Sequence, residues 1–110
     1  MIDWNRVCEL REEIGADDFL EVVEIFLEEV DEIVDRLAST PDPARFEEDL
    51  HFLKGSALNI GFSAFATSCA EGESKSANGA ASTVDLPAIL QCYRESRTRF
   101  LTQLETEAAA

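Results

Sequence analysis

The sequence is short of cations and of uninterrupted apolar segments, and each shortage excludes a class of function. Nine lysines and arginines stand against 23 aspartates and glutamates, so the formal net charge is −14. A general basic field that could hold nucleic acid or an anionic membrane is therefore missing. The longest uncharged run, from Gly55 to Ala70, contains several serines and is shorter than the roughly 20 apolar residues that cross a bilayer.

Histidine and cysteine are too few, and too far apart, for metal chemistry. His51 is the only histidine, and Cys8, Cys69 and Cys92 lack the paired spacing of a zinc site. We interpret the cysteines as small core residues that stay reduced. No signal peptide is visible, because the chain is polar and acidic from Asp3 onward. These features predict a cytoplasmic protein with no metal or cofactor of its own.

What the sequence does contain is helical periodicity throughout. Its 110 residues, 45% of them apolar, suit one domain over residues 1–110 with a modest core. A short helix is predicted from the cap Asp3 to about Ile14, and four longer helices near 17–38, 43–60, 63–76 and 85–105. Asp42 and Pro43 start the third of these, and Gly61 ends it. The expected fold is all-α: an antiparallel four-helix bundle with a short additional N-terminal helix packed across one end.

Apolar residues repeat at helical spacing and predict the face that each long helix buries. The expected core faces are Phe19, Val22, Val23, Phe26, Val30, Ile33 and Leu37 in the first long helix, Phe46, Leu50, Leu53, Ala57 and Ile60 in the second, and Leu86, Leu90, Tyr93, Phe100 and Leu104 in the last.

The second long helix carries His51 on the side opposite its core face, with Lys54 and Gly55 one turn away. An imidazole is largely neutral near pH 7, and its neutral form is a nucleophile that can accept a phosphoryl group on a ring nitrogen. A lysine one turn away can neutralise phosphoryl oxygens. Glycine at position 55 would leave the approach to the ring clear. The arrangement predicts a phosphorylatable histidine that another protein reaches.

The segment His-Phe-Leu-Lys-Gly-Ser-Ala that begins at His51, followed by Gly61 and Phe62, resembles the signature of histidine phosphotransfer (HPt) domains of bacterial two-component phosphorelays. The resemblance covers most of the chain. It implies a carrier that relays a phosphoryl group between aspartates of response-regulator receiver domains, with Mg²⁺ expected from the partner receiver. A hybrid or chemotaxis-type histidine kinase is the other implied partner. Since the sequence has no glycine-rich phosphate loop, we expect no ATP-dependent kinase activity of its own.

Glu73 is the residue that we expect to face His51. The turn at Gly61 is so short that the flanking helices must be antiparallel, and reflecting the chain about Phe62 places residue 51 level with residue 73. A carboxylate there can accept a hydrogen bond from Nδ1 of the imidazole and leave Nε2 free to attack. HPt relatives commonly carry Glu or Gln at the matching position. This chain departs from their pattern beside both residues, because Leu50 stands where a small residue is common and Gly72 where a large apolar one is common.

Apolar residues outside the core faces suggest where a partner docks. Leu58 lies on the outward side with His51, and Ile25 lies off the main stripe of its helix, so we assign partner contact to Gly55, Leu58 and Ile25. Scattered surface hydrophobicity is the other interpretation of Ile25. Two other functions stay open: direct phosphorylation of His51 by a chemotaxis-type kinase, and a non-phosphorylated adaptor that binds through Leu58. The motif needs only one protomer, so a monomer is expected.

Overall fold

Five α-helices and two short 3-10 turns make up almost all of the described chain. The computed structural model describes the backbone of residues 1–109 and the side chains of residues 1–106. In chain order the elements are α1 (Trp4–Ile14), α2 (Ala16–Ser39), η1 (Pro43–Arg45), α3 (Phe46–Ile60), α4 (Ser63–Ala77), η2 (Ala81–Thr83) and α5 (Leu86–Ala109). All five predicted helices are present, and the predicted and observed ends mostly agree within a few residues. The third prediction began too early, because residues 43–45 form a separate 3-10 turn before α3.

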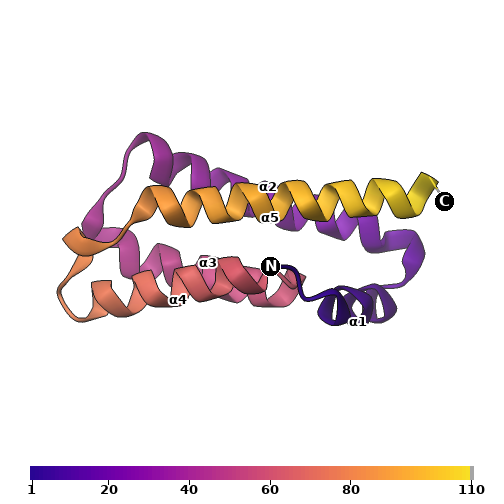
Figure 1. Cartoon of the computed structure of the whole chain (residues 1–110), viewed down its shortest axis with the longest axis horizontal. Coiled ribbons are helices and arrows are strands. Elements are labelled where there is room, and N and C mark those ends of the chain that lie inside the picture. The colour runs from indigo at the N-terminus through magenta and orange to yellow at the C-terminus, as the bar shows by residue number, and fades with distance from the viewer. Residues whose placement is uncertain (110) are drawn as a thin grey trace.

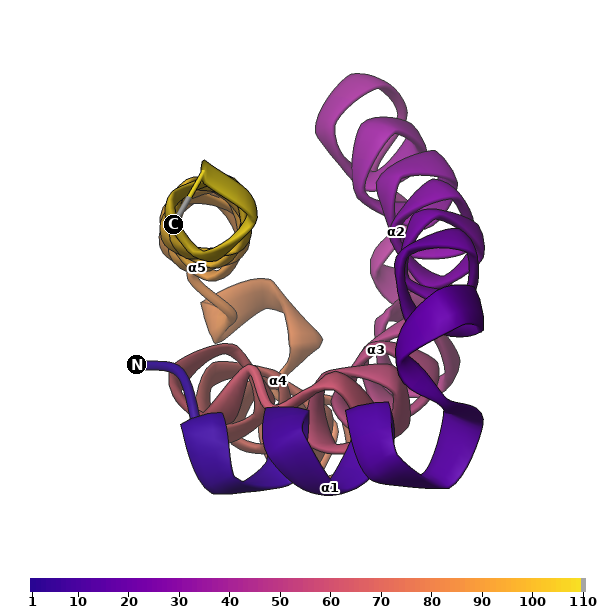
Figure 2. The same ribbon diagram turned by 90° about the vertical axis from the view of Figure 1, so that its right-hand side faces the viewer.

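Helices α2 to α5 form an antiparallel bundle, and α1 crosses one end of it (Figure 1). Each long helix packs against the next along the chain, and α5 also contacts α2, which closes the ring. Seen along the bundle, α1 lies across the ends of α3 and α4 (Figure 2). The all-α, four-helix prediction with an additional N-terminal helix is confirmed.

The predicted core faces of α3 and α5 are buried throughout, whereas that of α2 is rotated from its predicted position. Val22, Phe26 and Ile33 are only partly buried, and Leu27 and Val34 take core positions that the sequence analysis had not assigned. The rotation follows from the bundle, because α2 must face both α3 and α5 and therefore centres its buried stripe between them.

Polar contacts attach α2 to both of its neighbours. The carboxylate of Asp49 in α3 is buried, with 6% of its side chain exposed, and accepts a 2.7 Å hydrogen bond from the Arg36 guanidinium. On the other side, Asp31 accepts hydrogen bonds from the Tyr93 hydroxyl at 2.5 Å and from Arg97 at 3.2 Å. The contact with Arg36 holds a buried carboxylate two residues before His51 and helps to fix the register of α3, whereas the Asp31 contacts join α2 to α5.

The N-terminal segment caps the turn between α3 and α4. The Asp3 amide donates to the Gly61 carbonyl at 2.7 Å, and the Met1 carbonyl accepts from the Ala64 amide at 3.2 Å and from the Ser63 hydroxyl at 2.9 Å. Among the described residues, no side chain caps the start of α4, because Ser63 is already the first helical residue and its hydroxyl donates to the Met1 carbonyl. Segments 60 residues apart thus share one capped corner of the bundle.

Replacing Gly61 with alanine is expected to lower the free energy of unfolding by about 2 kcal/mol or more. Gly61 has a left-handed φ of 88°, and a Cβ there would lie 2.8 Å from the backbone oxygen of Asp3. Urea denaturation measures the loss. Gly79→Ala is the matched control, since Gly79 has a φ of 79° but no atom within 4 Å of an added Cβ. Equal losses in the two variants would show that the contact with Asp3 is unimportant.

Candidate functional site

His51 is displayed on the outer surface of α3, with 70% of its side chain exposed. The residues on its core side hold the helix in place, because Leu50 and Leu53 are completely buried. The ring therefore projects from a rigid support into solvent, where another molecule can reach it.

The carboxylate of Glu73 in α4 holds one nitrogen of the imidazole. The distance between His51 Nδ1 and Glu73 Oε1 is 2.8 Å, and 20% of the Glu73 side chain is exposed. An ionised carboxylate can only accept, so a neutral imidazole must carry its proton on Nδ1 to make this hydrogen bond. The contact expected from the reflection about Phe62 is present in the structure, and it leaves the lone pair of Nε2 available.

Lys54 contacts the same carboxylate, which the sequence analysis did not anticipate. Its Nζ lies 2.8 Å from Glu73 Oε2, so each oxygen of Glu73 contacts a different residue of α3. Lys54 had been assigned only to the neutralisation of phosphoryl oxygens, and no contact with Glu73 was predicted for it. The spacing of three residues between His51 and Lys54 was the available signal, because it points both side chains at one position of the facing helix.

The two contacts lower the pKa of the Glu73 carboxyl below its ordinary value. The hydrogen bond from Lys54 is the largest cause, followed by the hydrogen bond from His51, and partial burial opposes both. The favoured state of Glu73 is therefore the ionised one, which is the state that can accept from Nδ1.

The contribution of Glu73 to stability is expected to depend on pH. Because folding lowers the Glu73 pKa, the ionised carboxylate stabilises the folded protein above the ordinary value of 4.5, and this contribution is lost as the pH falls through the lowered pKa. Unfolding of wild type and Glu73→Gln is to be compared from about pH 7 down to about pH 3. We expect the difference between them to shrink in the acid range. Glu71→Gln, at an exposed position of the same helix, is the control, and a difference independent of pH would contradict the assignment.

The residues assigned to partner contact are exposed, although they do not form one cluster around the ring. A Cβ at Gly55 would meet no atom within 4 Å, and Leu58 and Ile25 are 58% and 52% exposed. Ile25 lies about 16 Å along α2 from Arg36, which pairs with Asp49, so it is nearer the level of Leu58 than that of His51. Phe52 directly follows His51 and is 42% exposed, and helical spacing places it away from the core face of α3, but it was not among the residues assigned to partner contact.

Of the three cysteines that were interpreted as core residues, Cys69 is buried and Cys92 is half-buried, whereas Cys8 is exposed. Burial raises the pKa of the Cys69 thiol to about 12, which keeps it protonated. Within the described side chains, no three of the His, Cys, Asp and Glu residues come together as a possible metal site. Among residues 1–109, no helix combines the length and apolar character needed to cross a membrane.

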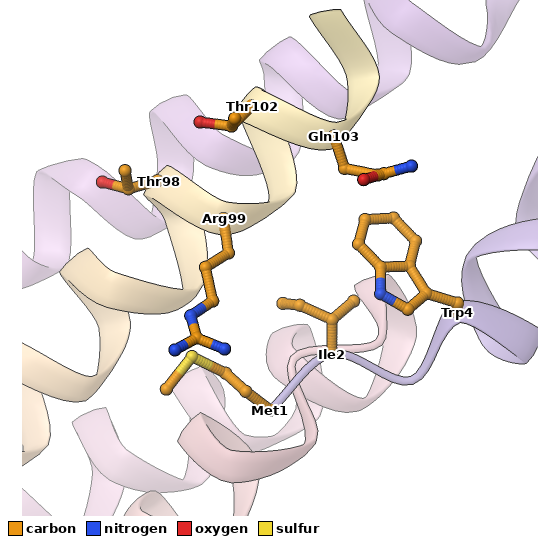
Figure 3. A pocket seen from close by; sticks show the side chains of 7 residues that line it. All are labelled: Met1, Ile2, Trp4, Thr98, Arg99, Thr102 and Gln103. Atoms are coloured by element: carbon orange, nitrogen blue, oxygen red, sulfur yellow. The ribbon is translucent and has the colours of Figure 1, made fainter. Parts of the chain in front are cut away.

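Two hollows of about 500 Å³ lie away from His51. The first lies between the N-terminal segment and α5, where Arg99 and Gln103 reach from α5 toward that segment (Figure 3). The second is mostly apolar and lies at the other end of the bundle, beside Phe46 and Leu90. Neither is lined by His51, Lys54 or Glu73, so the exposed ring stands outside both.

Comparison with known protein families agrees with this geometry. A family model described as Hpt domain matches residues 21–109. Among curated proteins and among solved structures, no match to the chain was found. The matched range is most of the chain, and it includes His51, Lys54 and Glu73.

Proposed function

Since the chain belongs to the Hpt domain family and is thereby a phosphotransfer module of two-component signalling, we propose that His51 relays a phosphoryl group between the aspartates of two receiver domains. One observation carries this proposal. The imidazole is 70% exposed, and Glu73 occupies Nδ1 at 2.8 Å, which leaves Nε2 as the nucleophile.

In the proposed reaction, Nε2 of His51 attacks the phosphorus of a phospho-aspartate. A bond forms between nitrogen and phosphorus, the bond between phosphorus and the aspartate oxygen breaks, and the carboxylate leaves with its electron pair. Positive charge develops on the ring during attack, and the Glu73 carboxylate stabilises it through the Nδ1 proton. Transfer to the second receiver is the same reaction in reverse.

Lys54 is proposed to neutralise the arriving phosphoryl oxygens. An ammonium group has three donors, so Nζ can keep its contact with Glu73 Oε2 and still donate to an oxygen on Nε2. Phosphoryl transfer depends mainly on in-line positioning and charge stabilisation. The Mg²⁺ and the acceptor aspartate are expected from the receiver domain, and no kinase activity is assigned to this chain.

The partner surface is proposed to include Gly55, Leu58 and Ile25, joined by the exposed Phe52. Gly55 leaves open space beside the ring, while the exposed apolar side chains can be covered by an apolar patch on a receiver. Glu47 and Glu48 are exposed one turn before His51, so a receiver with basic groups at that edge would complement them. Because one protomer supplies His51, Lys54 and Glu73, a monomer suffices, and we keep the cytoplasm as the proposed location.

The test is transfer of labelled phosphate from phosphorylated receiver domains to the purified protein. Label that is lost in acid and kept in base is bound to nitrogen, and its absence from a His51→Gln variant identifies the modified residue, because His51 is the only histidine. Incubation with ATP alone is the control and should give no label. Labelling only by a histidine kinase catalytic domain would favour direct phosphorylation, and no labelling by either donor would favour the adaptor.

A further inference from the structure

We propose that Leu50 and Gly72 are a matched packing pair that sets the distance between His51 and Glu73. Leu50 directly precedes His51 in α3, and Gly72 directly precedes Glu73 in α4. They act as positioning residues: neither contributes a polar group, but their contact fixes how closely the two helices approach. The inference rests on the proposed function only where the rate of phosphoryl transfer is measured; the hydrogen bond between His51 and Glu73 can be examined without it.

The contact between the two positions is tight. Leu50 is completely buried, and a Cβ added at Gly72 would lie 2.7 Å from its Cδ1 atom. The same Cβ would lie 3.0 Å from Cδ1 of Ile89 and 3.5 Å from Cγ1 of Val84, so α5 and the segment before it close the other side. The space that a side chain at position 72 would need is thus filled by Leu50 and Ile89.

The backbone conformation does not explain the glycine. Gly15, Gly61 and Gly79 have positive φ, whereas Gly72 does not and lies inside α4. A helix with glycine in its interior is less stable than the same helix with alanine at that position, so Gly72 lowers the stability of α4. What glycine provides there is the absence of a side chain opposite Leu50.

The two departures from the pattern of HPt relatives therefore become one reciprocal exchange. Here a large side chain precedes the histidine and no side chain precedes the glutamate. This arrangement fills the interface between α3 and α4 as a small residue before the histidine and a large one before the glutamate would. Leu50 packs against α4 at the residue directly before Glu73, so the absence of a side chain at position 72 does not leave Glu73 unsupported.

A change in the packing of Leu50 against Gly72 moves the reactive groups, because His51 and Glu73 are the next residues of α3 and α4. A larger side chain at position 72 must displace Leu50 or Ile89, or separate α3 from α4. The hydrogen bond of 2.8 Å between His51 Nδ1 and Glu73 Oε1 spans that same interface, and hydrogen bonds weaken steeply with distance and angle. A displacement of about 1 Å can cost a reaction roughly 100-fold in rate.

The experiment compares Gly72→Ala with the double variant Leu50→Val, Gly72→Ala. The double variant adds a methyl group at one position and removes a methylene group at the other, so the total volume is kept. Two readouts are used: the ¹⁵N signals of the His51 ring, which report the tautomer, and the transfer rate from a phosphorylated receiver. For Gly72→Ala we expect a mixture of tautomers and a transfer rate about 10-fold lower. For the double variant we expect recovery of the wild-type ring signals and of the rate to within about 3-fold.

Gly55→Ala is the control for the ring signals, because it adds the same methyl group to α3 in open space. Wild-type ring signals in Gly72→Ala would overturn the proposal, as would a folded double variant that recovers neither readout. If the wild-type protein accepts no phosphate from any receiver, the proposed relay fails, while the ring signals of the variants still decide the packing pair.

Discussion

Replacing His51 with glutamine is expected to reduce phosphate acceptance below detection. The amide of glutamine is not a nucleophile toward phosphorus, and the sequence has no other histidine to take over the reaction. The measurement is incorporation of labelled phosphate from a phosphorylated receiver into wild type and variant, followed by acid and base treatment. Lys54→Gln provides a graded comparison and should slow transfer without abolishing it, because it removes a charge and leaves the nucleophile.

The fold of the His51→Gln variant should be almost unaffected. The ring is 70% exposed, and a glutamine amide can still donate to Glu73, so the free energy of unfolding should change by less than about 1 kcal/mol. Loss of phosphate acceptance could then be attributed to chemistry. Acid-labile, base-stable label on a folded His51→Gln protein would contradict the assignment of the acceptor.

Replacing Phe100 with alanine is expected to cost about 3–5 kcal/mol of folding free energy. Phe100 is completely buried in α5, stacks on Trp4 with ring centroids 6.0 Å apart, and meets Phe62 edge-on at 5.4 Å. Its removal leaves a cavity where α5, α1 and the turn between α3 and α4 meet. A domain of this size is stable by only about 5–15 kcal/mol, so the loss is a large fraction of the total.

Denaturant unfolding measures this loss, and the fluorescence of Trp4 reports it locally because Trp4 is the only tryptophan. Phe52→Ala is the matched control, since it removes the same ring from a position that is 42% exposed and should cost less than about 1 kcal/mol. Similar losses in the two variants would show that the aromatic contacts of Phe100 do not stabilise the corner.

Much of the fold could be predicted from the sequence because it depends on periodicity and on caps. The stripe through Leu50, Leu53 and Ala57 fixed which side of α3 is buried, and therefore which side displays His51. The short turn at Gly61 fixed the antiparallel direction of α4, so counting residues was enough to bring Glu73 opposite the ring. These inferences need only the dimensions of a helix.

The features that could not be predicted depend on distances between helices, and the periodicity of a sequence gives no information about those distances. The contact of Lys54 with Glu73 requires that α3 and α4 lie close enough for a salt bridge of 2.8 Å. The rotated face of α2 reflects the positions of both neighbouring helices, which place Leu27 rather than Val22 in the core. The packing of Gly72 could not be predicted either, because its partner across the interface between α3 and α4 cannot be identified from the sequence.

The tight contact between Leu50 and Gly72 also limits the order in which these two positions can change during evolution. A larger residue at 72 with Leu50 unchanged overpacks the interface, at a cost of about 1–3 kcal/mol. Shortening Leu50 to alanine with Gly72 unchanged leaves a cavity, which costs about 2–5 kcal/mol. A lineage that exchanges the two sizes therefore passes through residues of intermediate volume at both positions, and each accepted substitution at one changes which substitutions are tolerated at the other.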